Sequence, residues 1–211
     1  MKAKIHAQDD LQLIRQMMER SSKFLSLSGL SGIFAGCTAL AGVAYINWGI
    51  LKVQGMSYPV YLQNLDAPAG ESVKLQLFAA VVVVLMVALA GAIYFSIRKV
   101  KRSGQKPGSK ATKQLIIHLA IPLVTGGIFS LILFQQNQIQ LVAASTLIFY
   151  GLALVNAGKF TFGEIHYLGL SEIVLGLLAA LFLNYGLFFW ALGFGVIHIG
   201  YGIALYRKYE R

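Results

Sequence analysis

Six uninterrupted apolar runs, each close to the length that crosses a lipid bilayer, constrain this sequence more than any other feature. A helix needs about 20 mostly apolar residues to span the hydrocarbon core. A transmembrane barrel is excluded, because its strands would alternate with a period of two residues. We therefore predict an all-α, polytopic membrane helix bundle with six transmembrane helices. The runs cover approximately Leu25–Leu51, Leu75–Ile97, Gln114–Phe134, Gln140–Gly158, Leu168–Leu183 and Gly186–Tyr206.

The composition supports a membrane protein and excludes a nucleic-acid partner. Hydrophobic residues make up 57% of the 211 residues and charged residues only 12%, whereas soluble domains have about 45–50% and 25%. The net charge of +10 would fit a nucleic-acid-binding protein only in a far more polar chain. The lipid bilayer is the expected partner. The single cysteine, Cys37, excludes an internal disulfide framework.

The distribution of Lys and Arg predicts the orientation in the membrane. Of these eighteen residues, all but Lys52 and Lys74 fall in segments that a six-span chain places on one side. Short loops rich in Lys and Arg stay in the cytoplasm. We therefore predict a protein of the cell (cytoplasmic, inner) membrane with both termini in the cytoplasm.

The chain is expected to be one membrane domain over residues 1–211, because too little of it lies outside the apolar runs to form a second core. Residues 1–24 are predicted to form a short amphipathic N-terminal helix on the cytoplasmic surface. Leu11, Ile14 and Met18 lie at helical spacing there, although a plain extension of the first span explains them equally well. Residues 25–206 form the predicted six-span bundle, and residues 207–211 form a cytoplasmic tail.

The connections between the spans differ in length. The outer connection 52–74 is the longest, and a loop of this length is either functional or disordered. The inner run 104–110 superficially suggests a phosphate loop, but it lacks the required spacing and is interpreted as a basic linker. The connections centred near Asn137 and Tyr185 are short, which predicts two antiparallel helical hairpins.

Small residues recur at four-residue spacing on three of the predicted spans. Such stripes let two helix backbones approach closely, so we expect helix packing there. The face on the first span contacts either another helix of the bundle or a second subunit, which leaves a homo-oligomer or a membrane partner open. The residues expected to pack helices are Ser28, Gly32, Gly36, Gly176, Gly195 and Gly202.

The last hairpin places an acidic and a basic side chain at the same expected depth. Glu172 lies thirteen residues before Tyr185, and His198 lies thirteen residues after it. At about 1.5 Å per residue, both lie roughly 20 Å from the turn, in the cytoplasmic half of the bilayer. Because a lone carboxylate there is costly, we expect the two to face each other. They form either a proton or ion site or a hydrogen bond that fixes the helix register.

The preceding hairpin gives a second pair by the same count. His118 lies nineteen residues before Asn137, and Asn156 lies nineteen residues after it, so both are expected near the cytoplasmic interface. Together with Glu172 and His198, they make up the candidate polar or ion site.

No motif points to an enzyme, a metal or a cofactor. A Ser–His–Asp set, paired carboxylates and a phosphate loop cannot be assembled, and the histidines lack the local spacing of a zinc site such as HExxH. We therefore expect a multi-pass membrane protein without enzymatic activity. The leading interpretation is small-solute or ion transport, proton-linked through Glu172 and His198. The alternative is a structural or regulatory membrane subunit that binds a partner through a small-residue helix face. A membrane-embedded enzyme ranks third.

Two stretches carry a resemblance to a known family. The segments Glu19–Gly32 and Gly193–Gly202 resemble an uncharacterised multi-pass membrane protein family of Bacteroidota-type bacteria. This resemblance implies a bacterial cytoplasmic membrane and no particular activity. The hairpin Leu175–Gly202 is also similar, more weakly, to the six-span acid-resistance membrane protein family.

Overall fold

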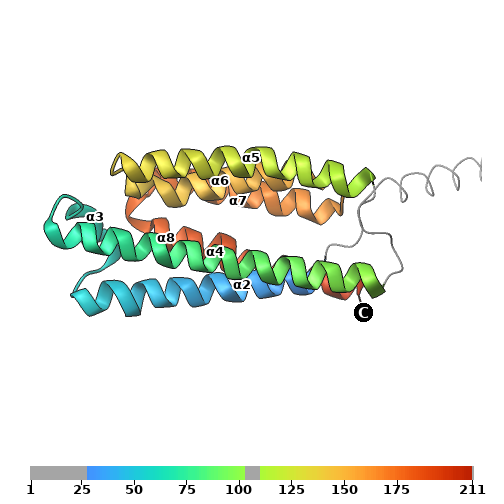
Figure 1. Ribbon diagram of the computed structural model, residues 1–211, viewed down its shortest axis with the longest axis horizontal. Helices are drawn as coiled ribbons and strands as arrows, with labels where there is room; N and C mark the ends of the chain where they lie inside the picture. Colours follow the sequence, from blue (N-terminus) through green and yellow to red (C-terminus); the bar gives the residue numbers. More distant parts are fainter. Residues whose placement is uncertain (1–27, 103–109, 211) are drawn as a thin grey trace, which may run out of the picture.

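The computed structural model describes residues 28–102 and 110–210, and every element in these ranges is helical (Figure 1). Six helices of these ranges are long and apolar enough to cross a membrane, which confirms the predicted all-α class and the number of apolar spans. The predicted amphipathic segment 1–24 and the run 104–109 lie outside the described residues.

The first half of the chain forms two long apolar helices joined by a short one. Helix α2 (Gly29–Ala44) continues through a π-helical segment, η1 (Tyr45–Leu51), and a 3₁₀ turn, η2 (Lys52–Gln54). Gly55 then takes a left-handed conformation with φ 69°, which glycine adopts without steric cost. A short helix, α3 (Tyr58–Gln63), precedes α4 (Pro68–Arg102).

The second half forms two helical hairpins. Helices α5 (Lys110–Gln135) and α6 (Ile139–Gly158) are joined by a turn at Asn137, whose φ is +61°. The other hairpin contains the remaining elements, which are α7 (Gly163–Leu181), η3 (Leu183–Tyr185), α8 (Gly186–Trp190), η4 (Ala191–Ile197) and α9 (His198–Tyr209).

The helix ends differ from the expected ones in three places. The second span is longer than predicted, because α4 has 35 residues. The long outer connection is shorter, because α3 occupies part of it. The fifth span begins at Gly163, so Glu164 and His166 lie in its first turns. The apolar run predicted for this span begins only at Leu168, because polar side chains at a helix end lower its local hydropathy.

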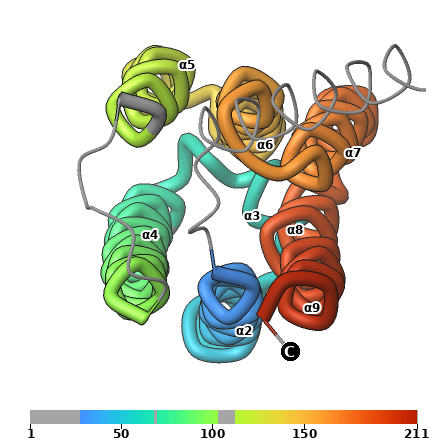
Figure 2. The backbone as a smooth tube through the Cα atoms, turned by 90° about the vertical axis from the view of Figure 1, so that its right-hand side faces the viewer, coloured from blue at the N-terminus to red at the C-terminus, as the bar shows by residue number. Residues whose placement is uncertain are grey.

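The helices form two layers that meet on one side of the bundle (Figure 2). Helix α2 packs between α4 and α9, whereas α6 packs between α5 and α7. The layers are joined mainly where α8 and η4 contact α6 and α7. On the opposite side, α4 and α5 make almost no contact with each other. Helix α3 lies at one end of the bundle, and the C-terminal residues lie at the other (Figure 1). We call these the α3 end and the C-terminal end.

The outer faces of α4 and α5 are apolar. Large side chains such as Val83 and Met86 of α4 and Ile121 of α5 are exposed. In water, a contiguous apolar surface of this kind would aggregate, whereas lipid chains solvate it. The exposed faces are therefore those expected of helices that contact lipid.

Helices α2 and α9 approach each other closely because both carry glycine at their contact. A Cβ on Gly32 would lie 3.2 Å from the Cα of Gly202, and one on Gly36 would lie 2.7 Å from the carbonyl oxygen of Gly195. The small-residue face of the first span is thus filled by another helix of the same chain. Gly176 packs instead on α6, where its Cβ would lie 2.9 Å from the nitrogen of Ile148.

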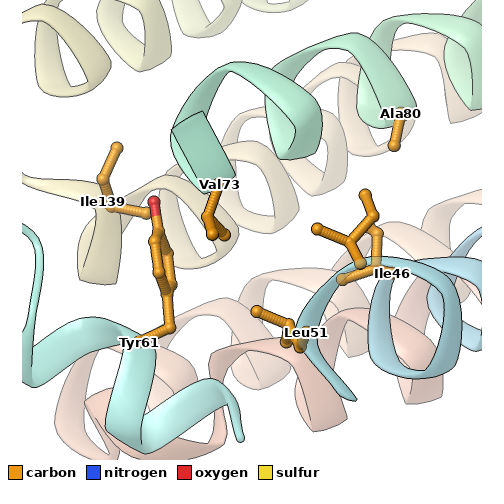
Figure 3. Packing of buried hydrophobic residues seen from close by; sticks show 7 residues of the cluster. Ile46, Leu51, Tyr61, Val73, Ala80 and Ile139 are labelled. Carbon is orange, nitrogen blue, oxygen red and sulfur yellow. The ribbon is translucent and has the colours of Figure 1, made fainter. Parts of the chain in front are cut away.

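A hydrophobic core at the α3 end ties the two layers together (Figure 3). It joins Ile46 and Leu51 of η1, Val73 of α4 and Ile139 of α6 around the ring of Tyr61. Tyr61 has no exposed surface. The short helix α3 is therefore anchored by one aromatic side chain that reaches between α4 and α6.

Candidate functional site

Glu172 and His198 meet inside the bundle. The Nδ1 atom of His198 lies 3.2 Å from Oε1 of Glu172, and the carboxylate side chain has no exposed surface. Glu172 lies in the middle of α7, and His198 is the first residue of α9, directly after the π-helical segment η4. The equal counts from the turn at Tyr185 therefore predicted the facing of these two side chains correctly.

The imidazole of His198 is held by two further groups. Its Nδ1 lies 3.0 Å from the carbonyl oxygen of Gly193, and its Nε2 lies 2.7 Å from the hydroxyl of Tyr150. A carbonyl oxygen only accepts hydrogen bonds, so Nδ1 carries the proton. In the neutral imidazole, Nε2 is then the acceptor, and the hydroxyl of Tyr150 donates to it.

The carboxylate of Glu172 has far fewer polar neighbours. Neither of its oxygens accepts a hydrogen bond of good geometry from another described residue, and the contact with His198 is one of distance alone. An isolated charged carboxylate in an apolar interior costs several kcal/mol. Glu172 is therefore either protonated or paired with a charged imidazole.

Gly193 gives the carboxylate its space. A Cβ at this position would overlap with Oε2 of Glu172. Gly193 belongs to η4, a π-helical segment, and single π-helical turns inside α-helices occur frequently at functional sites. The segment therefore positions a carbonyl oxygen beside the imidazole of His198 and leaves the space that the carboxylate of Glu172 occupies.

The sequence reading missed Tyr150, although a signal was present. Tyr150 lies thirteen residues after the turn at Asn137, the same count that relates Glu172 and His198 to Tyr185. Equal counts place all three residues at one depth along antiparallel hairpins. Counting thirteen residues from the turn at Asn137, as was done from the turn at Tyr185, therefore identifies Tyr150 as the third residue of the site.

Two of the predicted site residues lie elsewhere. The exposed His118 stacks on Phe160, with ring centroids 4.8 Å apart, and it does not hydrogen-bond to the buried pair. Asn156 lies six residues beyond Tyr150 on α6, which is about 9 Å along the axis and about 240° around it. The count from the turn gives only the depth of a side chain along its helix. His118 and Asn156 lie on helix faces that do not point toward Glu172 and His198.

An apolar cavity of about 120 Å³ lies at the α3 end. One face of α4, with Lys74, Leu77 and Val81, lines one wall, and one face of α6, with Val142 and Thr146, lines another. These residues are spaced by three, four and seven positions, as expected of one helix face. Residues of η1, α3, α5 and α8 complete the wall.

A row of aromatic rings leads from this cavity to the buried pair. Trp190 lines the cavity, and its ring centroid lies 5.0 Å from that of Phe194. Phe194 in turn lies 5.1 Å from Tyr150 and 6.0 Å from His198, centroid to centroid. Trp190, Phe194 and His198 are four residues apart, so they share one helix face.

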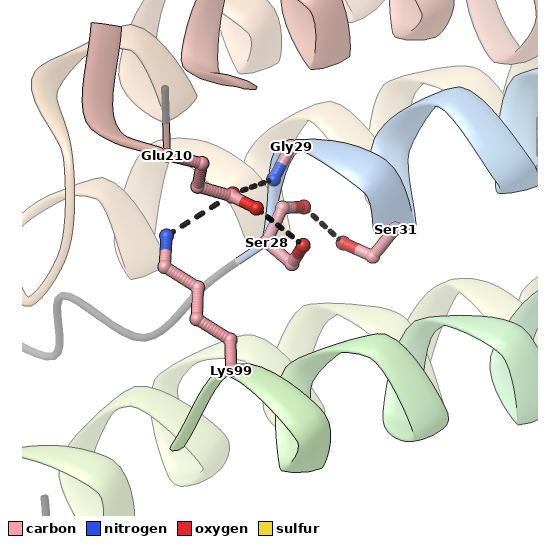
Figure 4. A network of polar contacts seen from close by, with 5 residues as sticks. All are labelled: Ser28, Gly29, Ser31, Lys99 and Glu210. Carbon is pink, nitrogen blue, oxygen red and sulfur yellow. Dashed lines mark hydrogen bonds and ion pairs between the residues drawn. The ribbon is translucent and has the colours of Figure 1, made fainter. Parts of the chain in front are cut away.

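Glu210 forms a second polar cluster at the C-terminal end (Figure 4). Its carboxylate accepts hydrogen bonds from the backbone N–H of Gly29, from Oγ of Ser28 at 3.1 Å and from Nζ of Lys99 at 3.1 Å. The first N–H groups of a helix lack partners within it and favour a negative charge. Glu210 therefore caps α2 and ties it to the ends of α4 and α9.

The remaining polar groups at this end do not form one site. Glu164 pairs with Lys208 and accepts a hydrogen bond from the hydroxyl of Tyr209 at 3.1 Å. His166 packs against Gly158 instead. Within the described residues, no group of three His, Cys, Asp or Glu side chains is placed to hold a metal ion.

Comparisons with known proteins add no relative. The chain matches no family model, no curated protein and no solved structure. The class that the fold defines is an all-helical protein with six helices of membrane-spanning length. The resemblance of Glu19–Gly32 and Gly193–Gly202 to a family of Bacteroidota-type bacteria stays a prediction.

Proposed function

We propose that the protein is a proton-linked carrier of a small solute or ion in a bacterial cytoplasmic membrane, with both termini in the cytoplasm. The observation that supports this most is the carboxylate of Glu172, which is fully buried, lies 3.2 Å from a histidine nitrogen and has no hydrogen-bond partner among the described residues. Ionisable groups at such depth are costly and commonly mark ion or proton pathways.

The chemistry of the three side chains supports reversible protonation. One proton shared between Glu172 and His198 gives either two neutral groups or an ion pair, and both forms are tolerated in an apolar interior. When His198 is protonated, both ring nitrogens donate, so the hydroxyl of Tyr150 changes from donor to acceptor by rotating. Proton uptake at this site therefore requires only small movements of three side chains.

Two structural features bear on access to the site. Trp190 and Phe194 are packed between it and the cavity at the α3 end, so a path from the cavity to the site requires these rings to move. The π-helical segment η4 lies directly before His198 and interrupts the regular helix there. Helix interruptions lining binding sites are a recurrent feature of transporters.

The proposal is tested by flux measurements on the purified protein in liposomes. A pH gradient is imposed, and proton movement is followed with a trapped fluorescent dye. We expect proton flux above that of empty liposomes, and we expect Glu172→Gln to abolish it while the protein still folds. Glu164→Gln is the matched control, because it makes the same change on the same helix at a surface ion pair.

The alternative is that the pair only fixes the register of α7 and α9 in a structural or regulatory subunit. This reading predicts that the wild-type protein moves no proton, cation or small solute. The Gly32–Gly36 face is already covered by α9 and η4, so such a subunit would need another surface for its partner. Absence of any wild-type flux would therefore replace the transport proposal by this one.

A further inference from the structure

The cavity at the α3 end has one cationic group. Lys74, in the second turn of α4, lines it and is buried. Its Nζ lies 5.0 Å from the centre of the Phe134 ring, also in the cavity wall. A buried ammonium group is costly unless an anion or an aromatic face compensates it. A ring supplies only part of that compensation.

Within residues 28–102 and 110–210, Lys74 forms an ion pair with one carboxylate, and this pair is weak. Oε2 of Glu71 lies 3.7 Å from Nζ, and the side chain of Glu71 is 64% exposed. A pair of this distance and exposure contributes little, because solvent screens it. Lys74 therefore keeps most of its capacity to bind an anion in the cavity.

Tyr61 adds a hydrogen-bond donor with no partner. Its side chain is fully buried, and its hydroxyl makes no hydrogen bond to a described residue. Figure 3 shows the ring standing between α4 and α6, with the hydroxyl beside Ile139. Burial and the nearby Tyr58 and Glu71 raise the pKa of Tyr61 above its usual value, so the hydroxyl stays protonated and needs an acceptor.

Tyr58 lies in the same wall. Burial raises the pKa of Tyr58 to about 12, so this hydroxyl is also a donor at neutral pH. Two polar side chains of the cavity, Lys74 and Tyr61, lack a strong partner, whereas the hydroxyl of Thr146 on α6 donates to the carbonyl oxygen of Ala143. A cation and a neutral donor together select a negatively charged acceptor.

The rest of the cavity is apolar. Lys74 and Val81 lie about 10 Å apart along the axis of α4, so the cavity extends from the α3 end toward the middle of this helix. Ile46, Val142 and Trp190 line the cavity with Val81. The volume of about 120 Å³ is similar to that of apolar protein cavities, of about 150 Å³, that bind benzene. The space therefore suits an apolar group of about the size of benzene, such as one part of a hydrocarbon chain.

We infer that this cavity binds an anionic amphiphile, whose negatively charged headgroup lies between Lys74 and Tyr61 and whose alkyl chain extends along Val81 toward Trp190. The shared chemistry is one anionic headgroup on a hydrocarbon chain, supplied by a free fatty acid or by an anionic phospholipid. The binding is independent of proton transport, since it uses neither Glu172 nor His198.

Trp190 makes the binding measurable. The chain has two tryptophans, and Trp48 is 61% exposed, so Trp48→Phe leaves Trp190 as the single fluorophore. The full-length protein is placed in phosphatidylcholine nanodiscs and titrated with 11-bromoundecanoate, because bromine quenches tryptophan on contact. We expect saturable quenching by the acid and much weaker quenching by its methyl ester, which has the same chain but no charge.

Variants then assign the headgroup contacts. Lys74→Met should raise the half-saturating concentration at least about tenfold, as expected for a lost charge-assisted hydrogen bond. Tyr61→Phe, which removes only the hydroxyl, should raise it less. Lys52→Met is the matched control, because it removes an exposed lysine at the same end of the bundle. A Trp190→Phe protein, which reports from Trp48, controls for quenching by probe dissolved in the bilayer.

The two sources of the ligand are separated by brominated phospholipids. Quenching by brominated phosphatidylglycerol that depends on Lys74 supports the proposal with a bilayer lipid as ligand, whereas quenching by the acid alone supports it with a free fatty acid. Equal quenching by acid and ester overturns it, and so does an unchanged titration in Lys74→Met. The comparison of acid and ester uses no Lys74 variant, so it decides the question even if Lys74→Met fails to fold.

Discussion

The hydroxyl oxygen of Tyr150 lies 2.7 Å from Nε2 of His198, across the interface between α6 and α9. This contact fixes the plane of the imidazole while Gly193 holds its opposite nitrogen. The orientation of His198 toward Glu172 therefore depends on a residue from a third helix.

Replacing Tyr150 with Phe should leave the fold intact and impair proton flux. The substitution removes one buried hydrogen bond, which contributes about 0.5–1.5 kcal/mol in soluble proteins and about 0.6 kcal/mol in a membrane. We expect a small fall in the detergent melting temperature together with a marked fall in liposome flux. A variant that transports at the wild-type rate would show that Tyr150 has only a packing role.

Glu172 and His198 should show energetic coupling. Removing one member of a buried charged pair costs about 3–5 kcal/mol, because the other charge stays behind. If both groups are neutral, each substitution should instead cost nearer 0.6 kcal/mol. Unfolding of Glu172→Gln, His198→Gln and the double variant in detergent measures the coupling as the departure from additivity. Strictly additive losses would mean that the two side chains do not interact in the folded protein.

Bulk at Gly36 should disrupt the contact between α2 and the last helix. A Cβ there would lie 2.7 Å from the backbone oxygen of Gly195, which cannot move aside as a side chain can. Overpacking of this kind costs about 1–3 kcal/mol, so we expect Gly36→Leu to lower the melting temperature. Gly127→Leu is the matched control, because nothing lies within 4 Å of a Cβ at that position. Equal melting temperatures for the two variants would contradict the packing seen here.

Loss of the Glu210 carboxylate should loosen the C-terminal end of the bundle. Glu210→Gln weakens the cap on α2 and the contact with Lys99, and hydrogen bonds to charged groups contribute about 1.5–3 kcal/mol. We expect lower thermal stability and faster amide exchange at the first turn of α2. Glu71→Gln serves as the control, because that carboxylate is exposed and 3.7 Å from its partner. Equal exchange in both variants would show that Glu210 does not cap α2.

The predicted orientation is tested with reporters. Sixteen of the eighteen Lys and Arg residues fall on the proposed cytoplasmic side, and an excess of this kind keeps a segment inside. An activity reporter fused after Arg211 should therefore read cytoplasmic, and one inserted near Asp66 should read external. The same reading at both positions would rule out the proposed six-span topology.

The sequence predicted the number and order of the long helices well, because hydropathy and turn residues are nearly sufficient to specify them. Apolar runs located all six long helices, and short polar breaks located the turns at Asn137 and near Tyr185. Helix ends were less predictable. Proline at the start of α4 and glycine at the start of α7 mark the true boundaries, but neither residue changes the mean hydropathy of a long window.

The sequence predicted how far along their helices the site residues lie, but only partly toward which neighbour each side chain points. Counting from a turn gives the level of a side chain along its helix, which brought Glu172 and His198 together correctly. It does not give the face, which is set by how the helices are rotated and by the π-helical segment η4. For this reason the count placed His118 and Asn156 with the pair, whereas His118 stacks on Phe160 and Asn156 lies on another face of α6 than Tyr150. Glu210 was missed because its partner, the first N–H of α2, is a backbone group almost a whole chain away.

The sparse contact between α4 and α5 affects which concentration of a ligand governs its binding to the cavity. Both helices face the cavity, through Lys74 and Phe134, and they separate it from the apolar surroundings on the side where the two layers do not meet. In a protein that spans the membrane as proposed, a molecule that enters between them would come from the lipid leaflet. Its effective concentration is its mole fraction in the bilayer, so a compound that partitions strongly into lipid fills the cavity at a low total concentration in water.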